Sequence, residues 1–382
     1  ALSIPTWYGI ELNAGIENIQ GARLDPSQTM GQTSYLGIQI PLAKNLVMDK
    51  RRAALQQAKI MQKMALQDQR KELNALLLEA MESYFSWQRS HQALMVVETN
   101  YKKATDRLAF VKKSVELGDR PAIDTLEALT QKQSFENQLY AKILEFNNAR
   151  LAVSAFLWSA ENNPVDLPEQ VIPAQNNEAG LLANFDLNLE SLVEKATQNH
   201  PEINAYRLKL DALGIEKKLK FQSLLPKLDV SYNHLSKGGP SLYGASFLEN
   251  NYKYGLKFEL PLRLSEGRGA YQQAKLKLEE EQLNLNQKSL QVAIKVRSYY
   301  KQFESLKQQI RTQEAAVANY QSLVRAEESR FELGESSLFL INSREVKALE
   351  AAEKLIDLKT YFLKTTVSLQ AYAGILSETS GL

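Results

Sequence analysis

The sequence has 382 residues, and 46 lysines and arginines against 44 acidic residues give it a formal net charge of +2. This balance, without a dense basic cluster, argues against a nucleic-acid-binding protein. The absence of cysteine excludes disulfides, cysteine nucleophiles and thiolate metal sites, and the three histidines show no metal-ligand spacing. There is no run of 18 apolar residues, so no transmembrane helix is predicted.

Four short segments are predicted to be strands, because apolar and polar residues alternate strictly in them. These segments are residues 10–17, 35–40, 228–234 and 252–260. The joins 18–33 and 235–251 are rich in Gly, Pro, Ser, Asn and Gln, which predicts two hairpin loops. The alternation changes parity after Pro5, which predicts a bulge near Gly9.

Each strand pair leads through a Pro-Leu pair into a run without proline that is compatible with one long helix. These helices are predicted over about 50–116 and 267–332, and each ends at a Leu-Gly pair, where glycine suits a helix C-terminus. A helix of about 65 residues is a rod of about 100 Å. Shorter helices are predicted over about 122–158, 188–224 and 338–376.

The two halves of the chain are related by a repeat, because residues 53–158 align with residues 269–374 without a gap. Matched positions include Tyr84 with Tyr300, Trp87 with Phe303, and Phe146 with Phe362. Part of this run forms a seam with steps of four and three, which is typical of helices that wrap on one another. The seam consists of Leu73, Leu77, Ala80, Tyr84, Trp87, His91 and Leu94.

The apolar strand faces have two alternative explanations, because helices could cover them or lipid could contact them. The long helices carry narrow seams rather than a broad apolar surface, which favours lipid. In hydrocarbon a sheet must close into a barrel, and four strands per chain are too few, so three copies with twelve strands are predicted. Aromatic residues that fit interfacial girdles are Trp7, Tyr8, Tyr35, Tyr252 and Tyr254.

The order of strand, loop, strand, Pro-Leu, long helix, Leu-Gly turn and return helix occurs twice. This doubled order resembles the TolC family of outer-membrane efflux proteins over nearly the whole chain. Residues 117–126 resemble the first helical tip of that family, and residues 331–342 resemble the second.

The resemblance implies a mainly α protein with a β-barrel part: a homotrimer with a twelve-stranded barrel in the outer membrane of a Gram-negative bacterium and a long α-helical coiled-coil barrel in the periplasm. It implies a periplasmic adaptor (membrane fusion protein), an inner-membrane pump, passive conduction of substrate and no cofactor. The expected domains are membrane strands in 1–42 and 226–262, periplasmic helices in 43–158 and 263–376, an equatorial connecting segment in 159–187 and a further α-barrel helix in 188–225.

Site residues follow from the same resemblance. The adaptor-docking tips would contain Leu117, Gly118, Asp119, Arg120, Pro121, Leu333, Gly334, Glu335, Ser336, Ser337 and Leu338. The candidate gate residues are Asp124 and Phe331, and the residues expected to face the lumen are Glu11, Glu17, Lys253, Lys257 and Glu259. The solvated turn and the helix cap remain the alternative explanations for the tip residues.

The sequence departs from the family pattern in two places. The helix of 188–224 has no complete counterpart before Pro5, where only four residues stand, so a first helix and a lipid-anchored cysteine would lie outside this sequence. At the gate, Phe331 takes the position of a tyrosine and Ser336 that of an arginine, while only Asp124 keeps a carboxylate. The family's gating network therefore does not transfer directly.

Two other classes of function remain as alternatives. One is a soluble coiled-coil scaffold with a small capping sheet, which would expose few aromatic residues on segment 252–260. The other is an enzyme on a helical bundle, but the sequence offers no histidine pair, no glycine-rich phosphate loop and no cluster of buried carboxylates. The outer-membrane channel is the prediction, and an enzyme is not expected.

Overall fold

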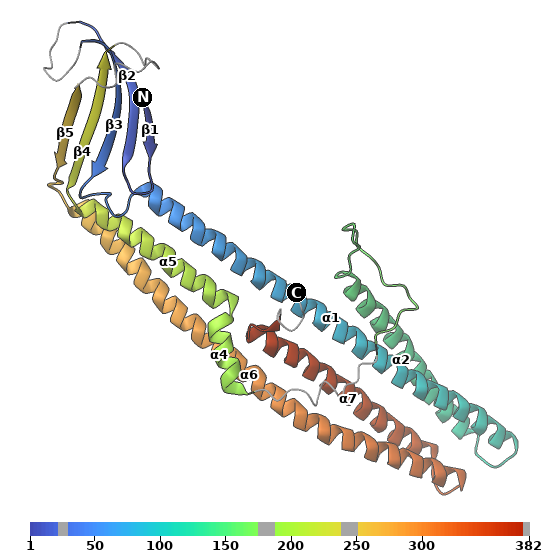
Figure 1. Ribbon diagram of the computed structural model, residues 1–382. Helices are drawn as coiled ribbons and strands as arrows, with labels where there is room; N and C mark the ends of the chain where they lie inside the picture. The colour runs from blue at the N-terminus through green and yellow to red at the C-terminus, as the bar shows by residue number, and fades with distance from the viewer. Residues whose placement is uncertain (22–29, 175–187, 238–250, 377–382) are drawn as a thin grey trace. The chain divides into compact units, whose positions relative to one another are not determined.

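The computed structural model describes residues 1–21, 30–174, 188–237 and 251–376 (Figure 1). The chain divides into two compact units, which are described separately below. The sheet unit contains Ala1–Asp68 and Glu202–Lys288, and the tip unit contains Gln69–Pro201 and Ser289–Leu382.

The sheet unit is built on one antiparallel sheet with the strand order β1-β2-β3-β4-β5. Its strands are β1 (Leu2–Pro5), β2 (Glu11–Ile19), β3 (Gly31–Pro41), β4 (Lys227–Lys237) and β5 (Tyr252–Glu259). The four predicted strands are thus present, and each is bounded by or near the turn-forming residues that the sequence indicated.

The strand register sorts the side chains into an apolar and a polar face, because neighbours along a strand point to opposite sides. One row across the four long strands consists of Leu12, Ile38, Tyr232 and Tyr254. The adjacent row, on the other face, consists of Glu11, Gln39, Ser231 and Gly255. The predicted alternation is therefore kept in register across all four strands.

Large side chains of the apolar face are exposed among the described residues. They are Leu12, Ile16, Leu36, Tyr252, Tyr254, Leu256 and Phe258. Leu256 reaches 72 % exposure on the edge strand β5, where it lies opposite Val230. The helix-covered alternative required these side chains to be buried, and they are not.

The sheet differs from the prediction at its first edge. Four strands per chain were expected, but β1 adds a fifth by pairing with residues 11–14 of β2. The feature expected as a bulge near Gly9 is a turn, in which the N–H of Thr6 donates to Ile10 O over 2.8 Å and Gly9 has a φ of 81°. The turn reverses the chain, which explains the change of parity after Pro5.

The expected hairpin loops are shorter than predicted, because the strands extend into them. Strand β2 continues to Ile19 and β3 starts at Gly31, while β4 continues to Lys237. The remaining loop residues, 22–29 and 238–250, lie outside the described part of the chain.

Tyr35 lies on the polar face of the sheet and not on the apolar one. Its ring covers Gly15, where a Cβ atom would lie 2.7 Å from the ring. The parity of β3 places Tyr35 on the other face from Leu36 and Ile38, so it does not share the apolar face with Tyr252 and Tyr254.

The two long helices are confirmed as α1 (Lys50–Glu116) and α6 (Ser265–Glu332). Neither contains proline, so no residue interrupts the i to i−4 hydrogen bonds along either rod. The return helices are α2 (Ile123–Ser154) and α7 (Leu338–Tyr372). Among the helices of the described ranges, none combines the length and the apolar character that crossing a bilayer requires.

The single helix expected over 188–225 is two helices, α4 (Leu189–Asn199) and α5 (Pro201–Phe221), followed by the 3-10 turn η1 (Gln222–Leu224). The break lies at His200, whose ψ of 124° is extended. A residue before proline is excluded from the helical region by the proline ring, and Pro201 then suits the first position of a new helix. The connecting segment 159–187 contains no helix over 159–174, and its residues 175–187 lie outside the described part.

Aromatic pairs hold the helices of the tip unit together. Trp87 of α1 stacks on Phe146 of α2 with ring centres 6.3 Å apart. Phe303 of α6 packs on Phe362 of α7 with ring centres 4.9 Å apart. The predicted repeat matches Trp87 with Phe303 and Phe146 with Phe362. The contact in the first half therefore has an equivalent contact in the second half. The repeat itself stays a prediction.

Candidate functional site: the two helical tips

The turn after α1 is fixed by two backbone hydrogen bonds. The N–H of Gly118 donates to Val115 O over 3.0 Å, and the N–H of Asp119 donates to Ser114 O over 2.9 Å. This pair of bonds is the Schellman motif, which requires a left-handed residue after the helix. Gly118 supplies it with a φ of 82°.

The turn after α6 has the same structure. The N–H of Gly334 donates to Phe331 O over 3.0 Å, and the N–H of Glu335 donates to Arg330 O over 2.8 Å. Gly334 has a φ of 77°. A Cβ atom on Gly118 or Gly334 would meet no atom within 4 Å, so both turns present an open surface.

A shared apolar cluster lies beneath the two turns and contains residues from α1, α2, α6 and α7. It consists of Leu108, Val111, Ala128, Phe331, Leu338 and Ile341. Phe331 and Leu338 come from the two ends of the second turn, and both are buried. The second turn is thereby held against α1 and α2 by burial of apolar surface.

Arg120 joins the first turn to the second helical pair. Its guanidinium carbon lies 3.7 Å from the centre of the Phe331 ring, and its Nη2 donates to Phe331 O over 3.1 Å. Its Nη1 lies 3.5 Å from Oδ2 of Asp124. The two candidate gate residues, Asp124 and Phe331, are therefore brought together by a residue predicted only as part of the docking surface.

A buried ion pair lies below the tips. Nη1 of Arg107 in α1 donates to Oε2 of Glu345 in α7 over 2.6 Å, and a second donor of Arg107 bonds the other carboxylate oxygen. Glu345 is only 2 % exposed. Arg107 also lies 3.8 Å from a carboxylate oxygen of Glu328. A carboxylate this deeply buried needs such a bidentate partner, because water cannot solvate it.

The carboxylate of Glu327 contacts three residues of the second turn and its flanking helices. It is buried, and the hydroxyl of Ser336 donates to its Oε1 over 2.5 Å. Arg330 and Arg344 each bring a nitrogen within 3.8 Å of its carboxylate. Ser336, which stands where the family has an arginine, therefore serves this turn as a hydrogen-bond donor to a carboxylate on its own hairpin.

Apolar side chains surround the polar turn residues on the outside of the tips. They are Leu117, Ile123, Leu126, Leu333, Phe339 and Leu340, all exposed, and we call them the tip collar. Leu333 is 75 % exposed and Leu117 is 69 % exposed. Clustered apolar side chains on an open surface indicate a contact surface for another protein.

The predicted docking residues divide into an exposed and a buried group. Most of the turn residues are exposed, whereas Arg120 and Ser336 are half-buried and Leu338 is in the core. Sequence reasoning did not select the collar residues Ile123, Leu126, Phe339 and Leu340. The available signal was the presence of large apolar residues in the first turn after each tip, where a solvated turn would have polar ones.

The five residues expected to face the lumen lie in the sheet unit and share its polar face. Glu11 and Glu17 are on β2, and Lys253, Lys257 and Glu259 are on β5, all with the parity of the polar row. Nζ of Lys257 lies 2.7 Å from a carboxylate oxygen of Glu259. The structure does not test which face lines a lumen, so this assignment stays a prediction.

Among the described residues, no group of three or more His, Cys, Asp or Glu side chains is arranged to hold a metal ion. The tips offer contact surface, ion pairs that hold two hairpins together, and turns that extend into solvent.

Comparison with known proteins identifies the fold. Residues 192–375 match the family model described as outer membrane efflux protein. The structure resembles three outer-membrane proteins: CmeC of Campylobacter jejuni (TM-score 0.65, 16 % identity, 96 % of this chain and 77 % of that one), VceC of Vibrio cholerae (0.67, 16 %, 96 % and 86 %) and MtrE of Neisseria gonorrhoeae (0.68, 15 %, 98 % and 81 %).

No curated protein sequence matches the chain significantly. The structural likenesses show a shared fold, and the family match covers α5, β4, β5, α6, α7 and most of α4. Residues 192–375 thus match the outer membrane efflux protein family, and the resemblance seen in the sequence is confirmed over these residues.

Proposed function

We propose that the chain is the outer-membrane channel of a tripartite efflux or secretion system. It conducts substrate passively from an inner-membrane pump and a periplasmic adaptor to the exterior. In this proposal the energy comes from the pump. Three copies form the channel, which lies in the outer membrane of a Gram-negative bacterium and extends into the periplasm.

One observation carries this proposal: the sheet has an uncovered apolar face and a polar opposite face. In water, exposure of Leu256, Phe258 and Tyr254 costs about 25 cal/mol for each square ångström of apolar surface. In a bilayer the same side chains are solvated by acyl chains. The polar face then lines an aqueous interior, as in transmembrane barrels.

The length and the edges of the strands support assembly into a closed barrel. Strands β2, β3, β4 and β5 have 9, 11, 11 and 8 residues, close to the 9–11 that cross a bilayer. The sheet of the described residues is open, with β1 and β5 at its edges. Open edges do not persist in hydrocarbon, so neighbouring subunits must complete the sheet. Three sets of the four long strands give twelve, and β1, with four residues, is too short to cross.

Within this proposal, the parts of the chain take the roles expected from the sequence. Residues 1–42 and 226–262 are the membrane part, and the helices of 43–158 and 263–376 form the periplasmic tunnel. The segment 159–187 is equatorial, and α4 and α5 replace the single helix of 188–225 in the tunnel wall. The tip turns and the tip collar dock the adaptor, because they combine open glycine turns with exposed apolar side chains.

The proposal is tested with a matched pair of lysine substitutions on opposite faces of the sheet. Leu256→Lys puts a charge on the apolar face, and Asn13→Lys puts the same charge on the polar face. A charge facing lipid near the middle of the bilayer costs about 2–4 kcal/mol, so Leu256→Lys should lower the yield of trimers in the outer-membrane fraction. Asn13→Lys should leave it near that of the wild type.

Two results would contradict the proposal. One is a wild-type chain that stays monomeric in buffer without detergent, which is the behaviour of a coiled-coil scaffold. The other is equal trimer yield in the membrane for both lysine variants, since a sheet face in water tolerates lysine on either side.

A further inference from the structure

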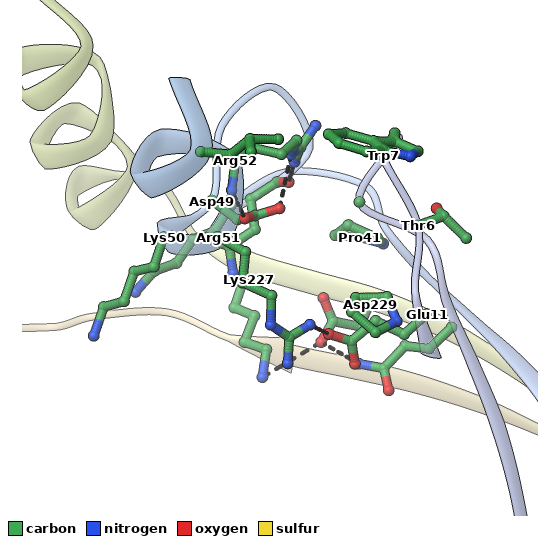
Figure 2. A pocket seen from close by; sticks show the side chains of 16 residues that line it. Thr6, Trp7, Glu11, Pro41, Asp49, Lys50, Arg51, Arg52, Lys227 and Asp229 are labelled. Carbon is green, nitrogen blue, oxygen red and sulfur yellow. Dashed lines mark hydrogen bonds and ion pairs between the residues drawn. The ribbon is translucent and has the colours of Figure 1, made fainter. Parts of the chain in front are cut away.

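A pocket of about 510 Å³ lies within the sheet unit, between the polar face of the sheet and the first turns of α1 (Figure 2). Trp7, Pro41 and Leu55 give it an apolar wall, and charged side chains form the rest. Its volume is in the range of sites that bind small organic molecules. None of the residues that line it belongs to the tips.

Cationic groups outnumber carboxylates in this pocket, five against three. The cations are Lys44, Lys50, Arg51, Arg52 and Lys227. The carboxylates are Glu11, Asp49 and Asp229. The lining therefore carries an excess of two positive charges at neutral pH, which is as large as the formal net charge of the whole chain.

Each carboxylate of the pocket already has a cationic partner. Arg51 lies 2.8 Å from Glu11, Arg52 lies 2.7 Å from Asp49, and Lys227 lies 3.4 Å from Asp229. Asp229 also accepts a hydrogen bond from Gln39 over 3.0 Å. Figure 2 shows these contacts as dashed lines.

The surplus charge of the lining is carried by Lys44 and Lys50, of which Lys44 also interacts electrostatically with Glu259 outside the pocket. Over the residues that the structure describes, neither ammonium group has a carboxylate within ion-pair distance inside this pocket. The first turn of α1 holds no acidic side chain and starts Lys50-Arg51-Arg52. Arg51 and Arg52 are paired with Glu11 and Asp49, so Lys50 is the cation of this turn whose charge adds to the positive end of the helix dipole and favours a bound anion.

The apolar wall is held in place by Arg52. Its guanidinium donates to the carbonyl oxygens of Asn45 and Leu46 as well as to Asp49. It also fills the space beside Gly9, where a Cβ atom would lie 2.7 Å from Nη2. The turn that carries Trp7 is thereby packed against the start of α1, and the Trp7 ring remains 69 % exposed at the pocket.

We propose that this pocket binds an organic anion with an aromatic or apolar body. The ring of Trp7 and the neighbouring Pro41 contact the body, and the surplus charge of Lys44 and Lys50 attracts the carboxylate, phosphate or sulfate group. The site follows from the pocket itself. Its role as a binding site for transported anions rests on the proposed function, in which the polar face of the sheet lines the lumen.

Tryptophan fluorescence of the detergent-purified chain tests the binding site directly, with 4-iodobenzoate as the probe. Iodine quenches an indole that it touches, and Trp7 is exposed at the pocket while Trp87 is buried. Saturable quenching is expected in the wild type and should be absent in Trp7→Phe, in which the exposed Trp158 remains. Quenching by the cation 4-iodobenzylammonium, which has a similar shape, should not be saturable.

The charge requirement is tested with the double variant Lys44→Gln/Lys50→Gln. Two partly exposed charges contribute about a factor of three to five each, so the apparent Kd for 4-iodobenzoate should rise roughly tenfold. Lys63→Gln removes an exposed lysine about 20 Å further along α1 and should leave the Kd unchanged. Circular dichroism checks that all variants keep the helix content of the wild type.

Quenching that is linear in 4-iodobenzoate, or an equal Kd in the double variant and the wild type, would overturn the site. The cargo role is tested by the anion-to-cation permeability ratio in planar bilayers, which should fall in the double variant. Channels that keep the same ratio would overturn that role. A wild type that forms no channels would contradict the proposed function, while the quenching experiment would still decide the binding site.

Discussion

The guanidinium of Arg120 lies over the ring of Phe331, 3.7 Å from its centre, although the two residues belong to different hairpins. The same guanidinium donates to the backbone oxygen of Phe331 and pairs with Asp124. One side chain thus links the first turn to the end of α6. Any movement that separates the two hairpins at the tips must break this contact.

Loss of Arg120 should loosen the tips. A cation over an aromatic face and a partly buried ion pair contribute about 1–2 kcal/mol together. Arg120→Ala should therefore increase the open time or the mean conductance of single channels in planar bilayers. Arg120→Lys keeps the charge but loses the planar stacking, so its effect should be intermediate. Unchanged records for both variants would show that this contact does not restrict the channel.

A large side chain at Gly334 should leave the fold intact but should block docking of the adaptor. With a φ of 77°, any other residue costs about 1–2 kcal/mol, and no neighbour blocks its side chain. Gly334→Trp should therefore still form trimers but should abolish adaptor-dependent efflux. The control is Gly214→Trp in α5, where a Cβ atom also meets no neighbour. Normal efflux with Gly334→Trp would contradict the assignment of adaptor docking to this turn.

The two partners of the buried ion pair should differ in their mutational cost. Arg107→Leu leaves the carboxylate of Glu345 buried without its bidentate donor, which should destabilise the chain by about 3–5 kcal/mol. Glu345→Leu should cost less, because Arg107 keeps Glu328 as a second carboxylate neighbour. Thermal unfolding of both variants in detergent measures the difference, and the double variant should recover much of the loss. Equal costs for the two single variants would contradict this account.

The N-terminus of α1 should show a pH-dependent stability that is due to Asp49. Burial acts to raise the pKa of Asp49, but its hydrogen bonds to Arg52 and the charge of Arg52 outweigh burial and lower the pKa below its ordinary value of 3.8. The ionised form is therefore favoured by folding. Its contribution is fully present above about pH 4 and is lost as the pH falls through the lowered pKa of the folded state.

The substitution Asp49→Asn keeps a side-chain acceptor for the N–H of Arg52 but removes the charge, whereas Asp49→Ala removes both. At pH 7 the alanine variant should lose about 1 kcal/mol and the asparagine variant less. The gap between wild type and Asp49→Asn should close below pH 4 in thermal melts followed by circular dichroism. A gap that stays constant down to pH 3 would show that the charge is not involved.

The sequence predicted those features that depend on local pattern. The alternation over 252–260 predicted strand β5 and which of its residues share the apolar side. The absence of proline predicted the full lengths of α1 and α6. The break at Pro201 was not predicted, although the residue before a proline is disfavoured in a helix. Strand β1 was missed because four residues are too few to show a period.

Contacts between segments far apart in the chain could not be predicted. Arg120 and Phe331 are 211 positions apart, and only the packing of four helices places one over the other. Asp124 and Phe331 were chosen by position in the family pattern, which carries no information about the residue that bridges them. The excess of cations around Trp7 could not be predicted for the same reason, since these cations come from β4, from α1 and from the segment between β3 and α1.

The side chains on the polar face of the sheet differ in length along the strands. Midway along β3, β4 and β5 they are short, with Gly37, Ser231 and Gly255, while charged side chains such as Glu17, Asp229 and Glu259 lie nearer the strand ends. A solute that travels along this face would find the widest passage halfway. Discrimination between solutes would then fall to the two rims, so substitutions at mid-strand positions should alter capacity and those at the rims should alter selectivity.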